Sequence, residues 1–218
     1  MRLVMGTKRS QSPWAACVAT AAIVLSLGIP PPVAAYSPSS AASYADTWAT
    51  NANYCSSHKC FTDNDCASFV SYSLRDGGGY AQAGVGGSTT DDHNWYLRYL
   101  VNGGWQYTHS WSVANDLYWF QIYHYPGGGL YGVVDGSTSA WHDGLSVGDL
   151  VFYDWDSNGV MNHVSIQVAY GTDPNGGWTG DLVDAHSSNR RHAYWALRPY
   201  NSQWATTRIY LVDIFSGN

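Results

Sequence analysis

Cys66 is the residue of this sequence whose surroundings best fit nucleophilic chemistry. It opens a short apolar run that reaches Leu74 and predicts a helix ending at the glycines 77–79. Asn64 or Asp63 can cap the first turn of that helix. A thiol at a helix N-terminus has its thiolate stabilised by the helix dipole, and the thiolate is the attacking species. The pattern therefore predicts an activated cysteine.

Two histidines stand where partners for this thiol are needed. A cysteine nucleophile requires a base within hydrogen-bond reach, and the base requires an orienting group. His163 stands near the start of an alternating strand pattern at 162–169, and His186 ends the next one. Asp184 shares a face with His186 in that strand. A cysteine, a histidine on a strand and a polar residue on the following strand form a workable order for a catalytic triad.

The elements that would position these side chains change character along the chain. The first half predicts helices and the second half predicts strands joined by Gly-rich and Asn-Gly turns. Helices are predicted at 41–54, 66–74 and 113–125, and strands at 130–134, 150–153, 162–169, 182–186, 195–198 and 208–215. Residues 91–101 predict a short helix or an irregular aromatic segment. Helices followed by antiparallel strands indicate one α+β domain, with N-terminal helices packed on a C-terminal antiparallel sheet.

The N-terminal segment has the pattern of a secretory signal peptide. Basic residues at 2, 8 and 9 precede an apolar stretch from Trp14 to Ile29, and the prolines 30–32 lead to the small residues 33–35. An uncleaved membrane anchor is the alternative, but the apolar stretch is short for a span. We expect cleavage near Ala35, a domain over 36–218, and a secreted protein without a membrane partner that can associate with the cell wall.

Composition excludes several classes of function. The chain holds 17 Tyr and 11 Trp but only 12% charged residues, which indicates an ordered domain. It contains no Glu, so the HExxH zinc helix and every other Glu-dependent motif are excluded. The net charge is −6 and becomes more negative when the basic leader is removed, so we expect no nucleic-acid partner.

Three cysteines remain after the predicted cleavage. Export implies an oxidising compartment, and Cys55 and Cys60 flank a short polar loop that a disulfide can close. Cys66 is then left unpaired, and an odd thiol in a secreted protein suggests reactivity. Pairing of Cys66 with either neighbour stays open. A zinc site built from these cysteines and His58 is disfavoured, because the ligands crowd together without a CxxC pair.

Five segments taken together resemble a known family. They are Asp65–Val70, Ser110–Ser112, Val147–Val151, Asn162–Ile166 and Asp184–Ser187. Their order resembles the putative amidase domain of secreted bacterial proteins, which is similar to the NlpC-type and CHAP-type cysteine peptidases. The likeness covers about Ala41 to Phe215.

The resemblance implies a papain-like core and a set of roles. Cys66 would be the nucleophile and His163 the general base. The third member would be His186, as in many NlpC-type enzymes, or alternatively Asp184. The implied activity is hydrolysis of amide bonds in peptidoglycan peptides by a monomer, with no metal and no cofactor.

Aromatic residues near the presumed cleft are candidates for substrate stacking. They are Trp105, Tyr107 and Trp111, although such residues more often fill a core. An alternative function uses the same features. A catalytically silent cell-wall-binding module would keep the papain-like shell and bind through an aromatic groove. The insert at 77–107 has no counterpart in the resemblance, so the substrate stays open.

Overall fold

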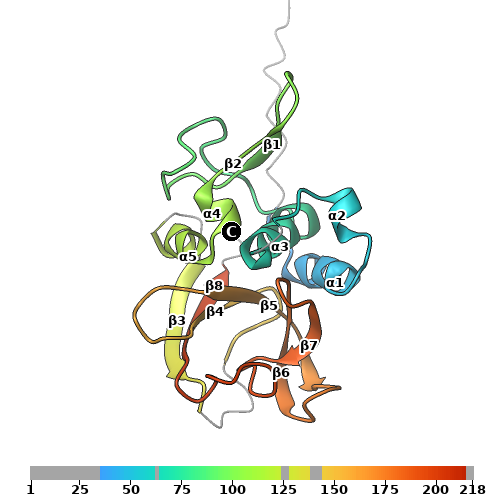
Figure 1. Ribbon diagram of the computed structural model, residues 1–218, viewed down its shortest axis with the longest axis vertical. Helices are drawn as coiled ribbons and strands as arrows, with labels where there is room; N and C mark the ends of the chain where they lie inside the picture. The colour runs from blue at the N-terminus through green and yellow to red at the C-terminus, as the bar shows by residue number, and fades with distance from the viewer. Residues whose placement is uncertain (1–34, 62–63, 124–127, 138–143, 215–218) are drawn as a thin grey trace, which may run out of the picture. The chain divides into compact units, whose positions relative to one another are not determined.

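A computed structural model describes residues 35–61, 64–123, 128–137 and 144–214 (Figure 1). All of them belong to the compact unit Val33–Asn218. The predicted signal peptide, residues 1–35, lies outside the described residues except for Ala35, and it stays a prediction. None of the described helices combines the length and apolar character that a bilayer-spanning helix needs.

The centre of the described fold is a six-stranded antiparallel sheet with the strand order β3-β8-β4-β5-β6-β7. The strands are β3 (Gly128–Asp135), β4 (Leu150–Asp154), β5 (His163–Thr172), β6 (Thr179–Ala185), β7 (Arg190–Tyr194) and β8 (Arg208–Ile214). Each neighbouring pair in this order runs antiparallel. The predicted antiparallel sheet in the C-terminal half is therefore confirmed.

Helices occupy the N-terminal half, as the sequence predicts, and lie together on one side of the sheet (Figure 1). They are α1 (Pro38–Trp48), α2 (Tyr54–Ser57), α3 (Cys66–Tyr72), the π-helical turn η1 (Ser73–Gly77), α4 (His109–Ser112) and α5 (Ala114–Tyr123). The predicted helix at 41–54 is divided, because α1 ends at Trp48 and α2 begins only at Tyr54. The α+β class is confirmed.

The core forms on both faces of the sheet. Along β4, Leu150 and Phe152 pack with the helices, whereas Val151 and Tyr153 pack in a second cluster with Trp195. Successive strand residues point to opposite faces, so this alternation buries β4 completely. A strand buried on both faces gives the sheet a rigid centre, next to which β5 holds His163.

A two-stranded hairpin replaces the helix or irregular segment expected at 91–101. It consists of β1 (Leu97–Tyr99) and β2 (Trp105–Tyr107), paired antiparallel. Gly103 and Gly104 have φ angles of 82° and 107° in its turn, which favours glycine. The irregular alternative is correct for residues 91–96, whereas 97–99 form a strand because aromatic residues on both sides of such a turn form a ladder more readily than a helix. The hairpin lies beyond α4, away from the sheet (Figure 1).

The strand predicted at 195–198 was also misplaced. The observed edge strand β7 ends at Tyr194, and the residues that follow form a turn in which the Leu197 N–H bonds to the Tyr194 carbonyl at 2.8 Å. Trp195 is fully buried in the second core cluster. Its apolar character therefore reflects burial and not membership of a strand.

Candidate active site

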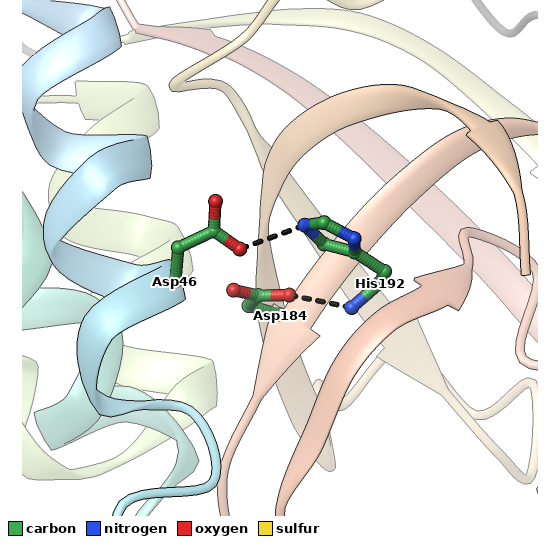
Figure 2. A group of neighbouring side chains, drawn as sticks. All are labelled: Asp46, Asp184 and His192. Atoms are coloured by element: carbon green, nitrogen blue, oxygen red, sulfur yellow. Dashed lines mark hydrogen bonds and ion pairs between the residues drawn. The ribbon is translucent and has the colours of Figure 1, made fainter. Parts of the chain in front are cut away.

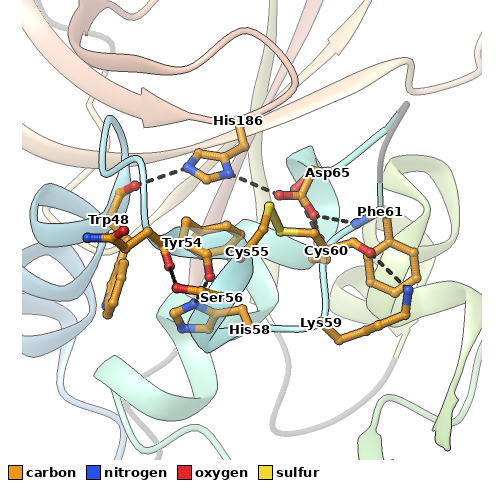
Figure 3. Close-up of a disulfide and its surroundings, with 12 residues drawn as sticks. Trp48, Tyr54, Cys55, Ser56, His58, Lys59, Cys60, Phe61, Asp65 and His186 are labelled. Atoms are coloured by element: carbon orange, nitrogen blue, oxygen red, sulfur yellow. Dashed lines mark hydrogen bonds and ion pairs between the residues drawn. A yellow bond between two sulfur atoms is a disulfide. The ribbon is translucent and has the colours of Figure 1, made fainter.

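Cys66 is the first residue of α3 and is fully buried. It carries a free thiol, whereas Cys55 and Cys60 form a disulfide (Figure 3). The predicted pairing is thus the one in the structure, and the alternative pairings of Cys66 are not. The unpaired thiol lies at the predicted helix start.

The predicted cap of this helix is not the observed one. Asp65 is the N-cap residue, and its side chain accepts no hydrogen bond from a helix N–H. Its Oδ1 accepts instead from the Ser68 hydroxyl and from the Phe61 N–H. Asn64 turns toward the thiol, and its Oδ1 accepts from Cys66 Sγ at 3.3 Å. Asp63, the other predicted cap, lies outside the described residues.

Several hydrogen-bond donors face the sulfur of Cys66. They are the N–H groups of Val164 and Ala67 and the hydroxyl of Ser187, and all three act to lower the pKa of the thiol. Burial outweighs them and raises the pKa above its ordinary value. The resting sulfur is therefore a neutral thiol. This differs from the thiolate that the helix dipole led us to expect. The free energy lost when a buried anion is removed from water exceeds the stabilisation that the helix dipole provides.

His163 begins β5 and is bonded through the backbone to Val164, whose N–H faces Cys66. Its ring is 6% exposed and stacks on Trp155 at 5.7 Å between ring centres. Its Nε2 is buried and has no hydrogen-bond partner among the described residues. Burial, with Arg190 adding positive charge nearby, lowers the pKa of His163 to about 3. The imidazole is consequently neutral at pH 7.

His186 follows β6 and turns toward the helices (Figure 3). Its Nδ1 lies 3.0 Å from Oδ2 of Asp65, and its Nε2 lies 3.1 Å from the carbonyl oxygen of Trp48. The ring stacks on Phe69 at 4.2 Å and meets the edge of Tyr54 at 4.3 Å. Both ring nitrogens are therefore engaged by α1 and by the residue before Cys66, and neither is left to hold His163.

The contact between His186 and Asp65 is almost closed to solvent, because the two side chains are only 3% and 11% exposed. A backbone carbonyl and a carboxylate are both acceptors, so a ring nitrogen of His186 donates to either of them only when it carries a hydrogen.

Asp184, the alternative third member, also lies away from His163. It pairs with Ile166 in the register of β5 and β6, and its Oδ1 accepts from the His192 N–H at 2.7 Å. Its carboxylate neighbours Asp46 of α1. Extending the β5–β6 register by three residues instead places residue 187 level with His163.

A cavity of about 430 Å³ opens beside His163. Its walls include Asn64, Trp155, His163, Ser187, Arg190 and Tyr200. A second cavity of about 520 Å³ shares Asn64 and is lined in addition by Phe61 and Tyr107. Asn64 thus borders both cavities while its side chain contacts the thiol. Together they offer room for an extended substrate on either side of Asn64.

The three aromatic candidates have different positions. Tyr107 lines the second cavity, where its ring meets Phe61 at 4.7 Å. Trp105 is 44% exposed on the hairpin and packs against Tyr99. Trp111 is fully buried between Tyr72 and Trp95, so it belongs to the core and offers no face to a substrate.

Sequence reasoning missed Asn64, Ser187 and Trp155 as neighbours of the site. Asn64 was interpreted as a helix cap, and Trp155 as part of a turn region. Ser187 could have been found, because it directly follows His186 at the end of a strand that pairs with the strand of His163. The other two depend on loop conformations that carry no periodic signal.

These features define an α+β domain in which a buried helical thiol faces a strand that begins with histidine. The chain matches the family model of the putative amidase domain over residues 35–212, and it therefore belongs to that family. This confirms the resemblance carried by the five segments. Membership indicates a hydrolase of amide bonds. No curated protein and no solved structure matches the chain.

Proposed function

We propose that this protein is a secreted cysteine amidohydrolase that cleaves amide bonds in peptidoglycan peptides through Cys66 and His163. One observation carries the proposal. The sulfur of Cys66 is met by the N–H of Val164, directly beside His163, whose buried Nε2 has no partner among the described residues and whose ring lines a cavity. A neutral imidazole that lines a cavity, on the residue beside the one whose N–H meets the thiol, supports the pairing of nucleophile and base that nucleophilic catalysis needs.

The mechanism starts from a neutral pair. As the sulfur attacks the amide carbon, the thiol proton passes to His163 and a tetrahedral oxyanion forms. His163 then gives that proton to the leaving amine, and the C–N bond breaks to yield a thioester. Water attacks the thioester with His163 as base, which releases the acid and returns the proton to the sulfur. No ion pair is required before substrate binds.

The oxyanion needs donors at the start of α3. The backbone N–H of Cys66 is the first candidate, because it lies at the start of the helix. The second candidate is the side-chain amide of Asn64, because this residue lines both cavities and its Oδ1 already faces the sulfur. Donors fixed before the reaction stabilise the developing charge without reorganisation.

His186 serves this site through Asp65 in our proposal. Asp65 directly precedes Cys66, and His186 contacts both Asp65 and the Trp48 carbonyl of α1, so it holds the first turn of α3 against α1. We therefore assign His186 a positioning role within the triad hypothesis. Asp184 is assigned no part in the reaction.

The substrate class follows from the cavity walls. Arg190 is the cation of the cavity that holds His163, and Tyr107 lies in the neighbouring cavity. Peptidoglycan peptides carry carboxylates that an arginine can bind bidentately. We propose that a monomer acts on them outside the cell after the leader is removed, with no nucleic-acid or membrane partner.

The proposal is tested with the mature protein, purified peptidoglycan and soluble muropeptides. We expect new amino groups and cleaved peptides in mass spectra, with Cys66→Ala and His163→Ala inactive while both remain folded by circular dichroism. Binding to peptidoglycan without cleavage by the wild type would overturn the enzyme and favour the wall-binding module. Cleavage that survives Cys66→Ala would overturn the cysteine mechanism.

A further inference from the structure

Three side chains that the proposed reaction does not use converge between α1 and the edge of the sheet (Figure 2). Asp46 comes from α1, Asp184 from β6 and His192 from β7. One ligand atom from each lies within 4.8 Å of the others. Asp184 is fully buried, and Asp46 and His192 are partly covered. The cluster therefore joins a helix to two strands at a largely buried point.

An irregularity in strand pairing creates this convergence. The register of β6 and β7 shifts between Val183 and Ala185, so Ala185 pairs with Arg190 and Val183 with Ala193. Two residues of β7, Arg191 and His192, thus stand opposite Asp184 alone. A bulge of this kind re-aims side chains. Here the His192 backbone N–H binds Asp184 Oδ1, while the His192 ring reaches Asp46.

The cluster leaves a buried oxygen unsatisfied. Oδ2 of Asp184 is buried and has no hydrogen-bond partner among the described residues. The neighbouring Asp46 can donate to it only if one of the two carboxyl groups is protonated, and two ionised carboxylates in one buried place repel each other. Burying a carboxylate without a counter-charge is costly, so a positive group is expected at this point.

The cations near the cluster do not reach that oxygen. His192 Nε2 lies 2.7 Å from Asp46 Oδ1, but the atoms are not aligned as a hydrogen bond. Arg191 Nε lies 3.1 Å from the same oxygen of Asp46, and its side chain is 50% exposed. One ligand atom each of Asp46, Asp184 and His192 can thus converge on one ion, since the three atoms lie within 4.8 Å of one another.

We propose that Asp46, Asp184 and His192 bind a divalent transition-metal cation of the Zn²⁺ type, which fastens α1 to β6 and β7. One imidazole and two carboxylates suit Zn²⁺, whereas Ca²⁺ takes six or more oxygen ligands. Water would complete the coordination. The ion would replace the missing counter-charge at Asp184 and would be separate from the thiol chemistry of Cys66.

A shared proton is the competing explanation for two facing carboxylates. Burial, with Asp46 beside it, raises the pKa of Asp184 to about 8 in the metal-free protein. A proton and a metal ion compete for the same atoms. The two explanations differ in one respect, because only the metal site requires His192 as a ligand.

The experiment uses the mature protein with Cys66→Ala, so that the thiol cannot bind metal. After treatment with EDTA, Zn²⁺ is titrated by calorimetry and the melting temperature is measured. We expect one ion per chain and a rise in melting temperature of about 5 °C or more at a hundredfold excess over Kd. Co²⁺ in place of Zn²⁺ should give visible absorption bands, a readout that needs no further variant.

The matched controls come from a second cluster. Asp91, Asp92 and His93 also group together, but they are largely exposed and bonded to one another. His192→Gln should lower Zn²⁺ affinity at least tenfold and abolish the melting shift, whereas His93→Gln should change neither. If His192→Gln fails to fold, Asp46→Asn takes its place. The proposal would be overturned if the protein with Asp46, Asp184 and His192 intact binds no Zn²⁺. It would also be overturned if Zn²⁺ binds equally tightly after His192→Gln.

Discussion

The Nδ1 atom of His186 lies 3.0 Å from Oδ2 of Asp65, the residue that directly precedes Cys66. The pair is nearly buried, and its other contact runs to the last residue of α1, Trp48. These contacts join the residue after β6 to the end of α1 and to the start of α3. Its effect on Cys66 is therefore one of position, transmitted through one peptide bond.

Removing the imidazole ring of His186 should cost stability. His186→Gln should lose at least one of the two ring contacts to Asp65 and Trp48, and leaving a buried acceptor unsatisfied costs about 1–3 kcal/mol. Urea denaturation measures this change. We also expect kcat to fall at least tenfold with the pH profile of the remaining activity unchanged, because the base is intact.

The control for this variant is a surface pair. His109 lies 3.5 Å from Asp116 with 54% of its side chain exposed, so His109→Gln should change stability by less than about 1 kcal/mol. Equal stabilities of the His186 and His109 variants would contradict the positioning role. A shifted pH profile in His186→Gln would instead indicate direct contact with the base.

Stability should depend on pH through His163. Its pKa is about 3 in the folded chain and 6.5 when unperturbed, so between these values the unfolded chain binds the extra proton. The contribution of the neutral, buried ring to the free energy of unfolding is complete above pH 6.5. It is lost as the pH falls toward 3, by at most about 1.4 kcal/mol per pH unit. Urea midpoints between pH 7 and 4 measure the slope.

His163→Gln isolates this contribution, since glutamine binds no proton. Its stability should fall less steeply with acid than that of the wild type, although the buried carboxyl groups titrate equally in both proteins. Parallel pH dependences would show that His163 is not buried as a neutral ring.

Alkylation should report the protonation of Cys66. The thiol is free, fully buried and raised in pKa, so iodoacetamide should modify it more slowly than a free model thiol at pH 7. Unfolding in urea without reductant should accelerate the reaction and direct it to Cys66, because Cys55 and Cys60 are paired. Peptide mapping gives the site. Rapid labelling of the folded protein near pH 6 would contradict a neutral buried thiol.

Asn64 should matter for the rate more than for substrate binding. If its side-chain amide stabilises the oxyanion, Asn64→Ala lowers kcat by about a hundredfold while KM changes little. Ser188→Ala is the matched control, because Ser188 is exposed on the wall of the same cavity. Comparable kcat values for the two variants would exclude Asn64 from the reaction.

The disulfide next to the site should contribute modestly. It closes a loop with a sequence separation of 5, for which loop-closure entropy corresponds to about 2 kcal/mol. Replacing both cysteines by serine should lower the unfolding free energy by that amount, as measured in urea. The loss of activity should be small if the link from Phe61 to Asp65 survives. Complete inactivation of the folded variant would instead give the disulfide a regulatory role.

Local pattern was enough to predict several features of this protein. Polar and apolar alternation predicted β5, because side chains of a strand alternate between faces and one face must be buried. The apolar run after Cys66 predicted α3, and short spacing in an exported chain predicted the Cys55–Cys60 pairing. The ordered motifs led to the amidase family. Each of these rests on residues close together in the chain.

Only the tertiary structure decided which polar partner each of these side chains contacts. His186 and Asp184 stand two residues apart, yet His186 turns to Asp65 and Asp184 to Asp46, with a register shift between β6 and β7 nearby. The state of Cys66 likewise depends on burial by distant segments, which outweighs the helix dipole that the sequence suggests. Contacts and solvent exclusion between segments far apart in the chain have no periodic signature, so the sequence alone could not assign these partners.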